Sequence, residues 1–342
     1  MSLKITGKLP SGKLLERLKQ SPNFKNGGFQ NLSPTPMKPD DISYWKMMRE
    51  FFKKNKDTAP AGLLPSVKTD LHKLNSAVII WFGHSSYLIR IDNKTFLIDP
   101  VFSGNAAPLS FMIKAFPGSN IYKAEDMPAI DYLILTHDHY DHLDFKTIRK
   151  LRTKVDKIYC SLGISSHLKY WGVDINKVTE MDWWETQQLE KNISLTAAPA
   201  RHFSGRGIKR GQTLWSSFIL KTSAYNLYLG GDSGYDFHFK EIGNKYGPFD
   251  LAILEAGQYN TMWPLIHMAP EETVQAAVDL NAKALLPVHW GKFSLSMHAW
   301  TDPVTRVLAK AEELNMKVLT PKIGQPIILN GSSFSSESWW KF

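Results

Sequence analysis

Cysteine is almost absent from this sequence: Cys160 is the only one among 342 residues. A single thiol cannot form an internal disulfide, which excludes a disulfide-stabilised secreted domain and makes the reducing cytoplasm the expected compartment. Long apolar runs are also missing. No stretch approaches the roughly eighteen residues that span a bilayer, and the first residues lack the apolar core of a signal peptide. We therefore expect a cytoplasmic protein. Peripheral contact with a membrane is an alternative that the sequence leaves open.

The composition is that of a globular protein rather than a disordered one. Hydrophobic residues make up 43% of the chain and charged residues 21%, which are ordinary proportions for a folded domain. The length allows one large α/β domain or two smaller ones. A formal net charge of +9 favours anionic partners such as nucleic acid, phospholipid headgroups or small phosphates, and charge alone does not choose among them.

Residues 1–65 differ from the rest of the chain because they are rich in Lys, Pro, Gly and Asn, with short helix-like pieces at 14–18 and 42–52. We expect an N-terminal arm that packs on the domain or is partly disordered. The piece at 14–18 is basic and mildly amphipathic, so contact with an anionic membrane surface is an alternative.

Residues 66–342 are expected to form the catalytic domain. Strand-like segments alternate with helix-like ones in two successive halves, each passing from β to α. Two such halves packed face to face predict an α/β fold of the four-layer αββα type. The apolar segment 101–120 lacks a clear period, so we expect either a loop packed under the core or an apolar lip beside the site.

The densest group of potential metal ligands is His137-Asp138-His139-Tyr140-Asp141-His142, directly after the strand-like run 132–135. Side chains two positions apart on an extended backbone point to the same side, so His137 and His139 can bind one ion. Asp141 and His142, where the chain turns, can reach a second ion. A polar surface turn is the alternative, but four donors within six positions favour a metal site.

Three further donors stand at the ends of strand-like segments: His202, Asp232 and His289. Asp232 lies within Gly-Gly-Asp-Ser-Gly, where glycines allow close approach of backbone, and its two oxygens could bridge two ions. Two zinc ions facing Asp141, Asp232 and one hydroxide leave a net positive centre, which favours an anionic substrate.

Other polar residues are expected around these ligands. Asp99 is placed after a strand to accept the second N–H of a ligating imidazole, or to cap a turn, and His84 is expected to act similarly. His267 precedes an expected helix start, where it could contact a phosphate or donate a proton.

The ordered set His137, His139, Asp141, His142, His202, Asp232 and His289 resembles that of the metallo-β-lactamase superfamily. Within it, the chain is most similar to the N-acyl-phosphatidylethanolamine-hydrolysing phospholipase D family, from about Gly27 to beyond His289. The stretches that carry this resemblance are Trp81-Phe82-Gly83-His84, Asp99-Pro100-Val101-Phe102-Ser103, Met181-Asp182-Trp183-Trp184-Glu185, Gly231-Asp232-Ser233-Gly234-Tyr235, Tyr246-Gly247-Pro248-Phe249-Asp250-Leu251 and His289-Trp290-Gly291-Lys292-Phe293.

The resemblance implies a dinuclear site in which two zinc ions, with manganese or iron as other options, hold a hydroxide that attacks the phosphodiester. One ion would be held by His137, His139 and His202. The other would be held by Asp141, His142 and His289, with Asp232 as the bridge. The products would be phosphatidic acid and an N-acylethanolamine.

Catalytic and substrate-binding roles follow from the same resemblance. Asp141 would also orient the hydroxide, and His267 is a candidate proton donor to the leaving alkoxide. Segment 255–260 departs from the pattern of the membrane enzymes, and Gln258 and Tyr259 there are candidates for substrate contacts. Arg206 is a further candidate on the ground of its charge alone, in a loop around His202 that also holds Arg201, Lys209 and Arg210; a solvated charged loop is the alternative.

Several other activities fit the same ligands. A lactonase of phosphorylated sugar acids would not need an apolar lip. A nuclease would suit the basic charge, but the chain lacks a separate RNA-binding arm or aromatic ladder, so nucleic acid is not the expected partner. Outside the hydrolases, a diiron redox module usually has Glu where His139 stands, and a metal-free scaffold would be expected to have lost ligands.

Overall fold

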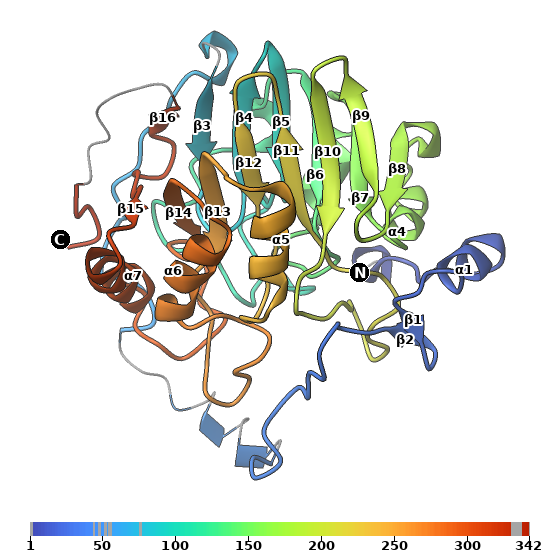
Figure 1. Ribbon diagram of the computed structural model, residues 1–342, viewed down its shortest axis with the longest axis horizontal. Coiled ribbons are helices and arrows are strands. Elements are labelled where there is room, and N and C mark those ends of the chain that lie inside the picture. The colour runs from blue at the N-terminus through green and yellow to red at the C-terminus, as the bar shows by residue number, and fades with distance from the viewer. Residues whose placement is uncertain are drawn as a thin grey trace.

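Two β-sheets pack face to face in the computed structural model, and helices cover their outer faces (Figure 1). The structure describes residues 3–43, 45–46, 49–50, 53, 57–74, 77–329 and 337–341. The layers follow the order helix, sheet, sheet, helix, so the predicted αββα sandwich is confirmed.

The first sheet has seven strands in the order β16-β3-β4-β5-β6-β7-β8. In chain order these are β3 (Val78–Trp81), β4 (Tyr87–Ile91), β5 (Lys94–Ile98), β6 (Ile130–Leu135), β7 (Val155–Ser161), β8 (Val178–Met181) and β16 (Pro326–Ile328). Apolar side chains from α3 (Phe145–Leu151) and α4 (Ser165–Tyr170) pack on its outer face. Strands β5 to β8 run parallel.

The second sheet also has seven strands, in the order β15-β14-β13-β12-β11-β10-β9. They are β9 (Thr186–Glu190), β10 (Ile193–Ala198), β11 (Ser217–Lys221), β12 (Asn226–Leu229), β13 (Leu251–Glu255), β14 (Ala284–Val288) and β15 (Lys317–Val318). Helices α5 (His238–Tyr246), α6 (Pro270–Asp279) and α7 (Asp302–Glu313) lie in front of this sheet in Figure 1.

The largest hydrophobic cluster lies between the two sheets and includes Ile79, Ile134 and Leu195 from both of them. Strand β10 is antiparallel to β11, and β11 is antiparallel to β12. Since β12, β13 and β14 are mutually parallel, the carboxyl ends of β10, β12 and β14 lie at one edge of the sheet. The segments that carry the predicted ligands therefore begin at this edge.

The N-terminal arm includes α1 (Lys13–Leu18) and the two-stranded pair β1 (Phe24–Lys25) and β2 (Gly28–Phe29). The remaining short elements are η1 (Leu3–Thr6), η2 (Leu71–Lys73), η3 (Ala124–Asp126) and η4 (Ile175–Lys177). Of the helix-like piece predicted at 42–52, residues 44, 47, 48, 51 and 52 lie outside the described part of the chain.

Segment 101–120 divides into a buried and an exposed part. Phe102 and Phe116 are buried, whereas Leu109, Phe111 and Met112 are exposed. The tip of this segment can therefore serve as the apolar lip that the sequence left as one of two options.

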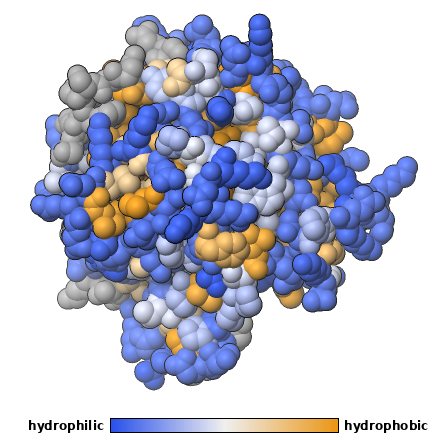
Figure 2. Space-filling view, viewed as in Figure 1, coloured by the Kyte–Doolittle hydropathy of each residue, from blue (hydrophilic) through white to orange (hydrophobic). Residues whose placement is uncertain are grey.

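None of the helices among the described residues is long and apolar enough to cross a membrane. On the face seen in Figure 2, apolar residues gather in separate patches between hydrophilic ones. Scattered apolar groups of this kind are usual on protein surfaces.

Candidate metal centre

Three histidines from both halves of the molecule meet at one point. His137 and His139 follow β6, and His202 follows β10. Nδ1 of His139 lies 3.0 Å from Nε2 of His137 and 3.2 Å from Nε2 of His202. Nitrogens bound at about 2.1 Å to one tetrahedral ion lie roughly 3.4 Å apart, so this spacing fits a single zinc-sized cation.

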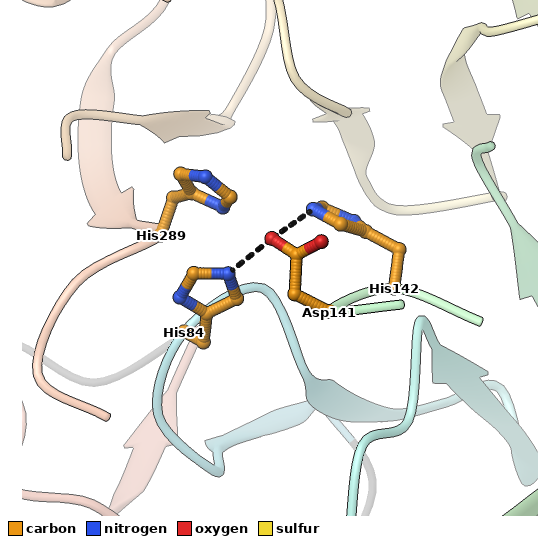
Figure 3. A group of neighbouring side chains, drawn as sticks. All are labelled: His84, Asp141, His142 and His289. Atoms are coloured by element: carbon orange, nitrogen blue, oxygen red, sulfur yellow. Dashed lines mark hydrogen bonds and ion pairs between the residues drawn. The ribbon is translucent and has the colours of Figure 1, made fainter. Parts of the chain in front are cut away.

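A second cluster contains His84, Asp141, His142 and His289 (Figure 3), and their potential ligand atoms all lie within 4.8 Å of one another. Oδ2 of Asp141 lies 2.9 Å from Nε2 of His84 and 3.6 Å from Nε2 of His142. The structure thus brings together the three ligands predicted for the second ion and adds His84 beside them.

Asp232 lies between the two clusters. Its Oδ2 is 3.7 Å from Nε2 of both His137 and His202. Its Oδ1 is 3.1 Å from Nε2 of His142 and 3.2 Å from Nδ1 of His289. One oxygen faces each cluster, which is the geometry that a bridging carboxylate requires.

Two glycines allow Asp232 to reach this position at the end of β12. A Cβ at Gly230 would lie 2.6 Å from the carbonyl oxygen of Ile253, and one at Gly231 would lie 2.8 Å from that of Ser216. Neither approach is possible for a residue with a side chain, so the paired glycines let the strand end pack between its neighbours.

Hydrogen bonds fix which nitrogen of the imidazoles faces the centre. Oδ2 of Asp99 lies 2.7 Å from Nδ1 of His142 and also accepts a hydrogen bond from the Thr136 hydroxyl. Nδ1 of His202 donates to the Ile266 carbonyl at 2.8 Å. Because a carboxylate and a carbonyl only accept, Nδ1 of both histidines carries a proton, and in the neutral imidazole Nε2 presents its lone pair to the centre.

Buried atoms without hydrogen bonds show that the site suits cations. Nε2 of His142, Oδ1 of Asp232 and Nε2 of His289 are buried and have no hydrogen-bond partner. A lone pair of His142 facing a carboxylate oxygen is repulsive unless a positive charge lies between them. These residues therefore fit divalent metal ions.

Most protonation states in the site agree with this conclusion. Burial lowers the pKa of His137, His202 and His289 well below the ordinary value, so these imidazoles are neutral, as metal ligands must be. His142 differs, because burial favours its neutral form but the carboxylate of Asp232 raises its pKa well above the ordinary value, so a bound cation takes the place of its Nε2 proton. Burial opposes ionisation of Asp232, but the positive charge of His142 outweighs it and holds the pKa of Asp232 well below the usual range. The carboxylate is therefore ionised.

His267 and Glu255 form a buried pair at the edge of the centre. Nδ1 of His267 lies 2.8 Å from Oε2 of Glu255. Burial raises the pKa of Glu255. Burial favours the neutral form of His267, but the adjoining carboxylate raises its pKa above the ordinary value. The pair leaves Nε2 of His267 as the nitrogen available to the cavity.

A cavity of about 270 Å³ lies against both clusters, and we call it the metal cavity. It is lined by Met37, His139, Asp141, His202, Phe203, Arg210, Asp232, Gln258, Trp263, Ile266, His267, His289 and Leu295.

Arg206, a predicted substrate contact, lies behind the ligand turn and does not line the metal cavity. It is 4% exposed, and its Nη1 donates to the carbonyls of Asp138 at 2.6 Å and Leu143 at 2.8 Å. Tyr259 lies in a neighbouring cavity and is hydrogen-bonded to Asp302. The structure therefore does not bring Arg206 and Tyr259 to the reacting centre.

Gln258 does line the metal cavity, but its carboxamide is already hydrogen-bonded to other residues of the protein. Its Oε1 accepts from the backbone N–H groups of Leu295 and Ser296. Its Nε2 donates to the carbonyls of His289 and Phe293. Gln258 therefore holds the chain after the last predicted ligand in place.

Two residues of the site were not singled out from the sequence. Oγ of Ser85 lies 2.9 Å from Nδ1 of His289, and Glu255 is the last residue of β13, between β12 and β14. Ser85 lies in the turn between β3 and β4. An acidic residue at the end of a parallel strand that neighbours ligand-bearing strands was a usable signal for Glu255.

Comparison with known proteins gives the relationship of this chain. The family described as Beta-lactamase superfamily domain matches residues 94–290. This chain belongs to the metallo-β-lactamase superfamily. The resemblance drawn from the ligand motif is confirmed, and the site described above is that of a metal-dependent hydrolase of this superfamily.

Two relatives in the superfamily extend over most of the chain. An uncharacterised protein of Mycobacterium tuberculosis is 36% identical over 329 residues, covering 94% of this chain and 88% of the relative. An N-acyl-phosphatidylethanolamine-hydrolyzing phospholipase D of Caenorhabditis elegans is 32% identical over 238 residues, covering 66% of this chain and 67% of the relative.

Solved structures of the superfamily share the fold. Igni18, a metallo hydrolase from the archaeon Ignicoccus hospitalis, matches with a TM-score of 0.54 at 19% identity, covering 73% of this chain and 97% of that one. The diiron β-hydroxylase CmlA from Streptomyces venezuelae matches with a TM-score of 0.56 at 17% identity, and the match covers 75% of this chain and 55% of that one. At these identities the match concerns the fold alone.

Proposed function

We propose that this chain is a two-zinc phosphodiesterase of the phospholipase D type that acts on N-acyl-phosphatidylethanolamine-like lipids. The observation that carries the proposal is the position of Asp232, with Oδ2 3.7 Å from His137 and Oδ1 3.1 Å from His142. Two ions joined by one carboxylate form the arrangement used for in-line displacement at phosphorus. The relationship to the Caenorhabditis elegans phospholipase D supports the lipid substrate.

Residues of the chain itself would orient the attacking water and protonate the leaving group. When bound, the metal ions lower the pKa of a water molecule and withdraw charge from the phosphoryl oxygens. Asp141, held by His84 at 2.9 Å, is placed to accept a hydrogen bond from the attacking water and to aim it at phosphorus. The bond that breaks joins phosphorus to the oxygen of the N-acylethanolamine.

His267 is the residue we assign to protonation of the leaving alkoxide. It lines the metal cavity, and Glu255 holds its Nδ1, so that Nε2 is oriented to the cavity. A proton donor fixed by a third group, within reach of the leaving oxygen, is the usual arrangement for general acid catalysis. The products are then phosphatidic acid and an N-acylethanolamine.

The test is turnover by the zinc-loaded protein on three substrates: vesicles containing N-acyl-phosphatidylethanolamine, a lactone of a phosphorylated sugar acid, and RNA. We expect release of N-acylethanolamine, its loss on chelation and its recovery on adding zinc. Turnover of the lactone or RNA alone would replace the proposal with one of those activities. Bound iron together with redox activity, measured by metal analysis and an oxygen electrode, would overturn it.

A further inference from the structure

The N-terminal arm encloses a second cavity beside the metal cavity. It has a volume of about 510 Å³, and we call it the arm cavity. Residues 26–35 of the arm form most of its wall, and Met37, His202, Phe203 and Arg210 line both cavities. A molecule bound at the metal centre can therefore extend from one cavity into the other.

The arm packs closely against the loop that carries Arg210. The Phe29 N–H donates to the Gly211 carbonyl at 2.7 Å, and Nε2 of Gln212 donates to the Gly27 carbonyl at 2.9 Å. A Cβ at Gly28 would lie 3.0 Å from the Gly211 carbonyl oxygen. These contacts hold the walls of the arm cavity in place without a ligand.

Arg210 brings an uncompensated positive charge to the junction of the two cavities. Its guanidinium lies over the Phe203 ring, 5.0 Å from the centroid, and makes no hydrogen bond or ion pair with any described residue. The described residues that line the arm cavity include no carboxylate. Arg206 provides a contrast, because Nη1 and Nη2 of its guanidinium already donate to backbone carbonyls.

The wall of the arm cavity is mixed, with Asn26 and Ser33 among its polar residues and Phe29 and Trp215 among its apolar ones. An acyl chain placed here would cover the polar residues and leave the Arg210 charge without a partner, which is less favourable than binding an anion. A substituent with a negative charge meets the polar residues and the free guanidinium, whose planar donors suit phosphate and carboxylate.

We propose that the arm cavity is a subsite for an anionic, polar substituent of the substrate, and that Arg210 recognises its charge. The proposal rests on the phosphodiesterase function proposed above, but not on N-acyl-phosphatidylethanolamine itself, whose two substituents are neutral. The preferred diester is a related one that carries a phosphate or carboxylate on one substituent, and that substituent lies between Arg210 and residues 26–35.

Calorimetry on the zinc-loaded protein tests the subsite without requiring turnover. The probes are propylphosphonate, with one anionic group, and propane-1,3-diphosphonate, with two on the same carbon chain. We expect the wild type to bind the diphosphonate roughly tenfold or more tightly, the effect of one charge-assisted contact. Arg210→Ala should remove this preference, and Arg210→Lys should keep part of it.

Lys209→Ala is the matched control, because it removes a neighbouring exposed charge that lines neither cavity, and it should keep the full preference. 4-Phosphonobutanoate, in which a carboxylate replaces one phosphonate, shows which anion the subsite prefers. Binding equal to that of the diphosphonate would indicate a subsite for either group, and weaker binding would indicate a subsite for phosphate. A wild type without preference, or a preference that survives Arg210→Ala, overturns the subsite.

Hydrolysis of a simple phosphodiester, measured separately, distinguishes the two proposals. Cleavage without an Arg210-dependent preference would overturn the subsite and leave the phosphodiesterase in place. A preference that depends on Arg210, in a protein that cleaves no phosphodiester, would overturn the proposed function and leave an anion subsite.

Discussion

At the residue scale, the site depends on side chains that face both ligand clusters or complete one of them. Asp232→Ala and His139→Ala should each remove most of the bound metal and nearly all hydrolysis. Asp232 contacts both clusters, and His139 contacts the two other histidines of its own cluster. Metal content per chain and turnover of bis(p-nitrophenyl) phosphate measure this. Asp156→Ala, which removes an exposed carboxylate, is the control. Wild-type turnover in either ligand variant would contradict the assignment.

Lys292 is a buried cation without a carboxylate partner among the described residues. Its Nζ donates to the carbonyls of Phe82 at 3.2 Å and Val101 at 2.9 Å, and burial lowers its pKa to about 7. Between about pH 7 and the ordinary lysine value, the unfolded chain therefore binds a proton that the folded chain does not. The contribution of Lys292 to stability is least favourable below pH 7 and improves as the pH rises through this window.

Lys292→Met tests this effect. The free energy of unfolding of the wild type, relative to the variant, should rise by up to roughly 3 kcal/mol between pH 7 and pH 10. Urea denaturation at several pH values measures the difference, and effects common to both proteins cancel. A difference that is constant with pH would show that Lys292 keeps an ordinary pKa.

The sequence was sufficient to predict that seven candidate ligands would come together, as they do in two clusters, but not to predict the partners of Arg206. The ligands were visible because histidines and aspartates followed strand-like segments. Arg206 looked equally functional, since composition shows a charge but not whether backbone carbonyls will satisfy it. Asp138 and Leu143, which accept its hydrogen bonds, are more than 60 positions away in the chain.

At the element scale, the N-terminal arm supports one metal ligand directly. Nδ2 of Asn31 donates to the His202 carbonyl at 2.8 Å, and its Oδ1 accepts from the His202 N–H at 3.0 Å. Asn31→Ala should lower zinc affinity by roughly 10- to 100-fold, as loss of an outer contact to a ligand usually does. Competition with a chelating dye measures the affinity.

Gln30→Ala provides the control for this prediction, because among the described residues the Gln30 side chain donates hydrogen bonds only to the Lys25 and Gly28 carbonyls, both within the arm. It should leave zinc affinity unchanged. Equal affinities in both variants would mean that the arm does not orient His202.

The tip of segment 101–120 is the element that we expect to contact lipid. Phe111 is 70% exposed, and the segment packs with Phe293 and Leu295, of which Leu295 lines the metal cavity. Phe111→Asp should weaken binding to anionic vesicles several-fold and spare a water-soluble phosphodiester. Sedimentation with vesicles measures binding, and Ile175→Asp, at an exposed site on η4, is the control. Unchanged sedimentation of the Phe111 variant would contradict a role for the tip.

The alternation of strand-like and helix-like segments in two successive halves, expected from the sequence, is present in the structure. Strand β16 was missed because it has only three residues and begins with Pro326, so it carries no alternating pattern of its own. Its place in the first sheet depends on pairing with β3, nearly 250 positions earlier. A local pattern cannot show such a pairing.

At the scale of the whole molecule, the ligand clusters join the two sheets. The segment 137–142 follows β6 of the first sheet, whereas His202, Asp232 and His289 follow strands of the second. Bound ions therefore stabilise the sandwich by an amount that grows with their affinity, about 4 kcal/mol for each ion present at a thousand times its dissociation constant.

Removal of the metals should lower the melting temperature by 5 °C or more, on the order expected for several kcal/mol in a chain of this size. Calorimetry with and without a chelator measures the shift, and returning zinc should restore it. Magnesium added in place of zinc is the control, since a site rich in imidazole binds it weakly. An unchanged melting temperature would show that the sheets do not depend on the ions.

The αββα architecture followed from two successive halves that each pass from β to α. The contribution of the arm could not be predicted in this way, because its glycine-rich segment 26–31 has no strong periodicity and its contacts with the ligand-bearing loop, such as Asn31 with His202, join residues far apart in the chain. The arm cavity became visible only when residues 26–35 were seen beside His202 and Arg210.

The pairing of β16 with β3 has a consequence for synthesis of the chain on the ribosome. Strand β3 lies between β16 and β4, so one row of its backbone hydrogen-bonding groups stays unpaired until residue 328 has emerged. A nascent chain interrupted before that point exposes a strand edge able to pair with other chains. The last strand to leave the ribosome is therefore the one that closes this edge against aggregation.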